Sequence, residues 1–235
     1  MSATTQAGGG ADRPGGAAPA PVVLVHGLYH VPAHFDAVAA SLRAAGGRVV
    51  VPELHRGSLT ADTAVVQEAV DGLGEPPVVL GHSYGGSVIT GLRGVRHLVY
   101  LAAFVPDAGE SAASLGGGSP ALRDAILPAP GGATRLDPAG AAHAFYGDCP
   151  APYAARATGL LRTQGPGHGW GVPERQAWRV TPSTYIVCAL DRAVDPALQR
   201  RLATRCTHVQ EWPTGHCPFT GRPELLVALL NDLRE

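Results

Sequence analysis

The sequence predicts an α/β protein with a mostly parallel, doubly wound sheet of about six strands. Two observations predict this class. Short apolar runs without polar alternation recur along the chain, as expected of strands covered on both faces. Segments with helical spacing of apolar residues lie between these runs, and strands that alternate with helices form parallel sheets. The expected strands are residues 22–25, 49–52, 78–81, 97–102, 183–189 and 208–212.

Helices are expected between these strands. Apolar residues recur with i, i+3, i+4, i+7 spacing over residues 35–42, and the glycine pair at 46–47 ends that helix. Residues 65–73 repeat the pattern. Pro196 and Pro223 occupy positions typical of the first residue of a helix, and apolar residues at helical spacing follow each of them.

The pentapeptide GHSYG at residues 81–85 follows an expected strand and precedes a helical segment. Strand, G-x-S-x-G and helix in this order are typical of the nucleophile elbow of the α/β-hydrolase fold, where a sharp turn exposes the serine Oγ. Gly81 and Gly85 leave room for the neighbouring strand and helix. The motif alone is weak in a chain with 31 glycines, and the flanking elements make it specific. Ser83 is therefore the predicted nucleophile.

The α/β-hydrolase fold requires an acid and then a histidine after the serine. Asp191 follows the expected strand 183–189, and His216 follows the expected strand 208–212. Both positions are at carboxyl ends of strands, where open α/β sheets form their sites. We predict that His216 moves the proton of Ser83 and that Asp191 orients the imidazole. Asp195, which resembles a helix cap, and Asp107, after the fourth strand, are the alternative acids.

An oxyanion hole needs two backbone N–H groups, each of which lowers the activation barrier by about 3–4 kcal/mol in measured cases. One is expected from Tyr84, directly after the nucleophile and at the start of a helix. The other is expected from Leu28, where the chain turns after His26-Gly27 at the end of the first strand.

The interval 106–182 contains no clear strand and interrupts the alternation. Asp137-Pro138 and Pro150 each open a short helical pattern, so we predict a helical lid insertion over the site. A second independent domain is the alternative, but the apolar residues there are too few for a separate core. His168, within this interval, is expected to be solvated or at a hinge.

The composition limits the class of protein. With 235 residues, 45% apolar and 16% charged, one domain with a sizeable core is expected, over residues 21–235. Residues 1–20, rich in Gly, Ala and Pro, are expected to be a disordered tail and not a signal peptide. The net charge of −1 gives no indication of nucleic-acid or membrane binding, and no apolar run is long enough to span a membrane.

The four cysteines lack C-x-x-C spacing, which argues against a zinc or dithiol site. We expect no metal and no cofactor, and a reducing cytoplasm as the setting. All 18 basic residues are arginine, and abundant Ala, Gly and Pro point to a GC-rich bacterial genome. The oligomeric state, monomer or dimer, does not follow from the sequence.

The chain resembles the small α/β-hydrolases of the plant methylesterase and hydroxynitrile lyase branch, and their bacterial carboxylesterase relatives. The segments that carry the resemblance are VLVHGLYH at 23–30, GHSYGG at 81–86, HLVYLAAFVP at 97–106, YIVCALDRAVDPALQR at 185–200 and TGHCPF at 214–219. The resemblance implies that Asp191, in the C-x-x-D stretch, is the triad acid. Hydroxynitrile lyases carry a threonine and a lysine where this chain has Gly27 and Cys217, which disfavours cyanohydrin cleavage and favours hydrolysis.

These features predict a serine hydrolase that cleaves a small apolar carboxylic ester or lactone through an acyl-enzyme. Two alternatives stay open: a biosynthetic tailoring enzyme on the same scaffold (thioesterase, C–C hydrolase or cyclase), and a small-ligand receptor without turnover. An apolar, aromatic pocket is expected around the site or under the insertion. Its predicted residues are Tyr29, His30, His82, Phe104, Leu115, Phe145, Tyr146, Trp170, Trp178 and Cys217. No arginine is placed to bind a carboxylate or a CoA phosphate of the substrate, and Arg192, next to the acid, is expected at the surface.

Overall fold

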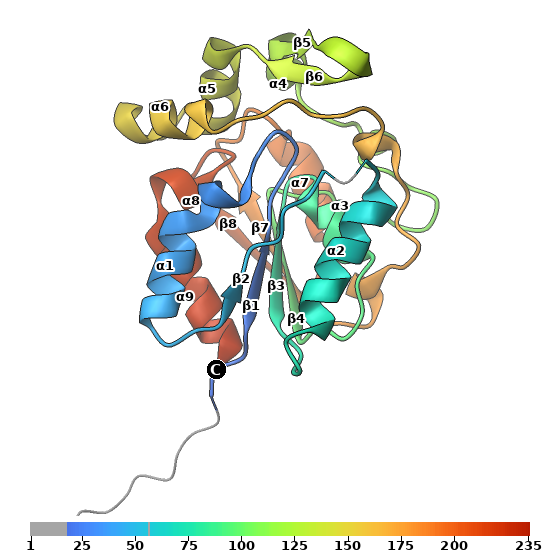
Figure 1. The fold of residues 1–235 in the computed structure, drawn as a ribbon, viewed down its shortest axis with the longest axis vertical. Helices are drawn as coiled ribbons and strands as arrows, with labels where there is room; N and C mark the ends of the chain where they lie inside the picture. Colours follow the sequence, from blue (N-terminus) through green and yellow to red (C-terminus); the bar gives the residue numbers. More distant parts are fainter. Residues whose placement is uncertain (1–17, 56) are drawn as a thin grey trace, which may run out of the picture.

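The computed structural model describes residues 18–55 and 57–235. Six parallel strands form one sheet in the order β2-β1-β3-β4-β7-β8 (Figure 1). They are β1 (Val22–Val25), β2 (Val49–Val50), β3 (Val78–His82), β4 (His97–Leu101), β7 (Ser183–Cys188) and β8 (His208–Trp212). The predicted α/β-hydrolase fold class is thereby confirmed. Residues 1–17, most of the predicted tail, lie outside the described residues.

Helices cover both faces of the sheet (Figure 1). One face carries α1 (Asp36–Ala44), α8 (Pro218–Gly221) and α9 (Pro223–Arg234), and the other carries α2 (Leu59–Asp71), α3 (Gly85–Thr90) and α7 (Pro196–Ala203). Successive strand residues supply the two cores alternately. On β3, Val78 and Leu80 pack with α1 and α9, whereas Val79 packs with α2 and α3.

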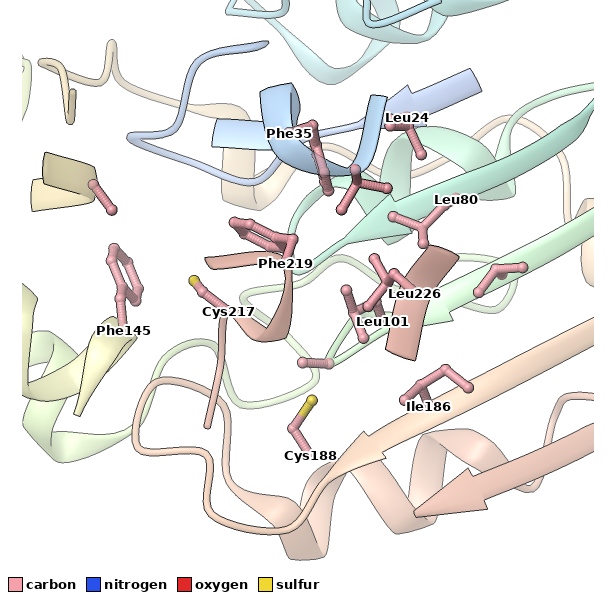
Figure 2. Packing of buried hydrophobic residues seen from close by; sticks show 14 of the residues in the cluster. Leu24, Phe35, Leu80, Leu101, Phe145, Ile186, Cys188, Cys217, Phe219 and Leu226 are labelled. Carbon is pink, nitrogen blue, oxygen red and sulfur yellow. The ribbon is translucent and has the colours of Figure 1, made fainter. Parts of the chain in front are cut away.

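The core on the α1 side reaches from the middle of the sheet to the site. Leu24, Leu80, Leu101 and Ile186 come from four adjacent strands, and Phe219 lies above them, toward the carboxyl ends (Figure 2). Every one of these side chains is at most 1% exposed. This continuous apolar layer holds the strand ends, and therefore the loops after them, in fixed positions.

Two details of the expected strands are wrong. The second strand has only two residues, Val49–Val50, and both are half-buried. The sixth strand, β8, is largely exposed, because it lies at the edge of the sheet. These edge strands need less apolar surface than the central ones, which is why their sequence patterns are weaker.

The interval 106–182 contains short helices, but the expectation that it contains no strand is wrong. It forms α4 (Pro120–Ala125), α5 (Pro138–Tyr146), α6 (Ala151–Gly159) and an antiparallel hairpin of β5 (Ile126–Pro128) and β6 (Thr134–Leu136). The hairpin turns at Gly131 and Gly132, whose φ angles of 71° and 75° favour glycine. These elements lie beyond the carboxyl ends of the parallel strands (Figure 1).

Candidate active site

The G-x-S-x-G turn connects β3 to α3 and holds Ser83 at a φ of 55°. A left-handed non-glycine residue costs on the order of 1–3 kcal/mol and persists only where its surroundings fix it. Here the Ser83 carbonyl accepts hydrogen bonds from the backbone N–H groups of Gly86 (3.0 Å) and Phe104 (3.2 Å). A Cβ on Gly81 would lie 2.6 Å from the Gly85 carbonyl oxygen, and a Cβ on Gly85 would lie 2.6 Å from that of Val25. The turn therefore needs both glycines.

The loops after β7 and β8 bring Asp191 and His216 together. His216 Nδ1 lies 2.7 Å from Asp191 Oδ2, and both side chains are at most 1% exposed. Gln199 Nε2 donates to the same carboxylate oxygen at 2.7 Å. Asp191 Oδ1 accepts from the backbone N–H groups of Ala193 (2.6 Å) and Val194 (3.0 Å). Four donors thus hold this buried carboxylate in one orientation.

The imidazole of His216 lies between two other rings. Its centroid is 5.3 Å from that of Phe145, in a stacked arrangement, and 4.5 Å from that of His82. His82 Nε2–H donates to the His216 carbonyl oxygen at 3.0 Å. Burial lowers the pKa of His82 well below its usual value, so this residue stays neutral and adds no positive charge beside His216.

The structure places the two predicted oxyanion donors at the same cavity. The backbone N–H groups of Leu28 and Tyr84 donate to no other group within residues 18–55 and 57–235. His26 holds the Gly27–Leu28 peptide in place, because its Nδ1–H donates to the Gly27 carbonyl oxygen at 3.0 Å and its Nε2 accepts from the Leu54 N–H at 3.3 Å. Burial lowers the pKa of His26 to about 4, so the ring is neutral near pH 7.

A cavity of about 180 Å³ opens beside Ser83. Its walls are mostly apolar and come from the elbow, the insertion and the loops after β1, β4 and β7, including Phe104, Leu122, Ile126 and Val194. Of the predicted pocket residues, Tyr29, Phe104 and Phe145 line this cavity.

Seven predicted pocket residues do not line this cavity: His30, His82, Leu115, Tyr146, Trp170, Trp178 and Cys217. Trp170 is 75% exposed, and Trp178 uses its indole N–H to bind the Pro106 carbonyl oxygen. His30 and Tyr146 are buried beneath the β1 loop: Tyr146 Oη lies 3.1 Å from His30 Nε2, and His30 Nδ1–H donates to the Leu28 carbonyl oxygen at 2.9 Å. These two rings support the loop and are not part of the cavity wall.

Three residues at or near the site were missed by sequence reasoning. Arg123 of α4 borders the cavity, and it binds the Gly118 carbonyl oxygen at 2.6 Å. Gln199 is fully buried on α7, and Asp62 is fully buried on α2. Each of the last two interrupts an apolar helix stripe with a polar side chain, and this interruption is the signal that the sequence offered. His168 was expected to be solvated or at a hinge, and the structure excludes the first alternative because the residue is only 3% exposed.

In residues 18–55 and 57–235, no cluster of three or more His, Cys, Asp or Glu side chains could hold a metal ion. None of the helices in this described part of the chain is long and apolar enough to cross a membrane.

A sheet of six parallel strands with an elbow turn after β3 defines the α/β-hydrolase fold. Residues 22–229 match the alpha/beta hydrolase family, and the chain belongs to this family. The predicted resemblance and enzyme class, an α/β-hydrolase related to named esterases, are confirmed.

Similar proteins include named ester-cleaving enzymes. A carbendazim hydrolyzing esterase from Nocardioides sp. is 38% identical over 110 residues, a match that covers 40% of this chain and 46% of the esterase. The crystal structure of a pyrethroid hydrolase from Sphingobium faniae has a TM-score of 0.80 at 26% identity and covers 92% of this chain and 97% of its own. A methylesterase from Arabidopsis has a TM-score of 0.75 at 19% identity, covering 90% and 97%, which shows the shared fold.

Proposed function

We propose that the chain is a serine hydrolase that cleaves a small apolar carboxylic ester or lactone through an acyl-enzyme. One observation carries the proposal: Ser83 lines the same apolar cavity as Leu28 and Tyr84, whose N–H groups have no partner within residues 18–55 and 57–235. A carbonyl group held there would meet a nucleophile and two donors at once. The buried pair of His216 and Asp191 supplies a base next to the elbow.

The proposed reaction has two steps. Ser83 Oγ attacks the ester carbonyl carbon while His216 Nε2 takes the hydroxyl proton, and His216 then gives this proton to the departing alcohol. Water next attacks the acyl-enzyme, its proton passes through His216 back to Ser83 Oγ, and the carboxylic acid leaves. Asp191 accepts a hydrogen bond from the Nδ1–H group of His216, which keeps Nε2 free to act as the base in both steps.

The cavity and the insertion together indicate the substrate size. A space of about 180 Å³ with mostly apolar walls fits a short acyl or aryl group. Residues 106–182, which supply Leu122, Ile126 and Phe145 to these walls, are proposed to be the lid. The names of the relatives, a carbendazim esterase and a pyrethroid hydrolase, support ester-type small molecules as the substrate class.

Labelling with a fluorophosphonate, measured beside hydrolysis of p-nitrophenyl butyrate, tests this proposal. The Oγ of an activated serine displaces fluoride from phosphorus, so intact mass should show one adduct, and peptide mapping should place it on Ser83. Turnover of the ester should be lost in the labelled protein. One adduct without any turnover would contradict ester hydrolysis and favour a receptor or a tailoring enzyme, and absence of an adduct would contradict an activated serine.

Replacing Leu122 by alanine is expected to widen the cavity and to shift the preference toward longer acyl chains. One methylene in an apolar pocket changes specificity by about 10-fold or more, so the ratio of kcat/KM for p-nitrophenyl hexanoate to that for the butyrate should rise roughly 10-fold. Leu127→Ala is the matched control, because Leu127 is half-buried on neighbouring β5 and does not line the cavity. Equal ratios in both variants would contradict the assignment of this cavity as the acyl site.

A further inference from the structure

A buried carboxylate lies behind the elbow. Asp62, on α2, is fully buried, and its Oδ2 accepts a hydrogen bond from the Tyr84 hydroxyl group at 2.9 Å. His168 Nε2, from the insertion, lies 3.7 Å from the same oxygen. Tyr84 and His168 are 1% and 3% exposed. Burying a carboxylate is costly unless hydrogen bonds and charges compensate, so its presence on an otherwise apolar helix face calls for a role.

The contacts continue from His168 to the β1 loop. Gln164 Nε2–H donates to His168 Nδ1 at 2.9 Å, and Gln164 Oε1 accepts the backbone N–H of Tyr29 at 3.4 Å. His168 Nδ1 also lies 3.2 Å from the Gly165 carbonyl oxygen, and Nε2 faces Asp62 Oδ2 at a distance longer than a hydrogen bond. These contacts form one series that runs from Tyr29 through Gln164 and His168 to Asp62. We call Tyr29, Asp62, Tyr84, Gln164 and His168 the Asp62 network.

We propose that Asp62 is a positioning residue that holds both backbone donors of the oxyanion hole, one through Tyr84 and the other through His168 and Gln164. The inference rests on the proposed function of the Ser83 site. The Tyr84 side chain bound to Asp62 fixes the residue whose own N–H lines the cavity. Gln164 binds the peptide N–H directly after Leu28 and so fixes the second donor.

The network joins four segments that are distant in the sequence: the loop after β1, α2, the elbow, and the part of the insertion that contains Gln164 and His168. Burial and the Asp62 carboxylate raise the pKa of Tyr84, so its hydroxyl keeps its proton and continues to donate. Donors aligned in advance stabilise charge that develops only in the transition state. Loosening them should therefore lower kcat and leave substrate binding largely unchanged.

The test compares Tyr84→Phe with Tyr100→Phe. Tyr100 is a matched control, since it is fully buried and its Oη lies 3.1 Å from Thr90 Oγ1, away from the Asp62 network. Tyr84→Phe should lower kcat for p-nitrophenyl butyrate about 10-fold with KM unchanged, a smaller loss than complete removal of a donor causes. The affinity for a trifluoromethyl ketone, whose hemiketal oxyanion occupies the hole, should fall by a similar factor. Tyr100→Phe should change thermal stability but neither of these two quantities.

A second variant guards against misfolding of the first. Gln164→Glu keeps an oxygen acceptor for the Tyr29 N–H and removes the amide donor to His168 Nδ1, so kcat and ketone affinity should again fall together. The inference would be overturned if Tyr84→Phe and Gln164→Glu had the same kcat and the same ketone affinity as the Tyr100→Phe control, in a protein whose turnover still depends on Ser83. Loss of the proposed function itself would look different, because the unaltered protein would then show no turnover that depends on Ser83.

Discussion

Ser83→Ala is expected to lower kcat for p-nitrophenyl butyrate by about a millionfold, the loss seen when a triad serine is removed elsewhere. Without Oγ no acyl-enzyme can form, and only the oxyanion donors and binding remain to accelerate attack by water. The fold should persist. The bonds that hold the elbow involve the Ser83 backbone N–H and carbonyl groups, which alanine retains.

Ser87→Ala is the matched control for this change. Ser87 is 1% exposed on α3, only four residues from the nucleophile, and its Oγ has no hydrogen-bond partner within residues 18–55 and 57–235. This variant should keep full activity, because it removes a buried hydroxyl that contributes no bond there. Steady-state rates and circular dichroism of both variants decide the matter: a folded Ser83→Ala protein with normal turnover would show that another group is the nucleophile.

The central part of the fold was predictable because its signals are local. The four interior strands, β1, β3, β4 and β7, are continuous apolar runs, since helices cover them on both sides. The edge strands and the β5–β6 hairpin gave weaker patterns because solvent or a single layer of chain contacts them. Gly131 and Gly132 are a turn signal, but the strands beside them have three residues each, too few for a periodicity to emerge.

The candidate site divides in the same way. Ser83, Asp191 and His216 could be proposed from the sequence because each follows a strand that is itself recognisable. The cavity wall was not, because it depends on how the insertion folds back over the sheet. Trp170 and Phe145 are both aromatic residues of the insertion, yet Trp170 is 75% exposed and Phe145 is 3% exposed. Their sequence neighbourhoods do not distinguish them.

Buried polar residues form a third group, between these two. Gln199 and Asp62 interrupt apolar helix stripes, so the sequence shows that something there must be hydrogen-bonded. It does not show the partner. Gln199 bonds to Asp191 and Asp62 to Tyr84, contacts that span 8 and 22 residues of sequence. Only the packing of α7 and α2 on the sheet brings these partners within reach.

Asp191→Asn is expected to lower kcat about 10,000-fold, as in a triad where the same exchange leaves the geometry intact. The backbone N–H groups of Ala193 and Val194 bind Oδ1 and will keep an oxygen at that position. The new amide nitrogen must then replace Oδ2, where it faces His216 Nδ1 and Gln199 Nε2. His216 will respond by moving its proton to Nε2, and in this tautomer it cannot accept the proton of Ser83.

Asp195→Asn separates this effect from loss of charge near α7. Asp195 caps the helix by accepting the Ala197 N–H at 2.8 Å, and asparagine caps helices about as well. The kcat of Asp195→Asn should therefore stay close to that of the unaltered protein. Asp191→Asn should keep its melting temperature to within a few degrees but lose turnover. The structure favours Asp191, because His216 Nδ1 contacts its carboxylate at 2.7 Å. If Asp195→Asn nevertheless lost activity and Asp191→Asn kept it, the acid that orients His216 would have to be reassigned.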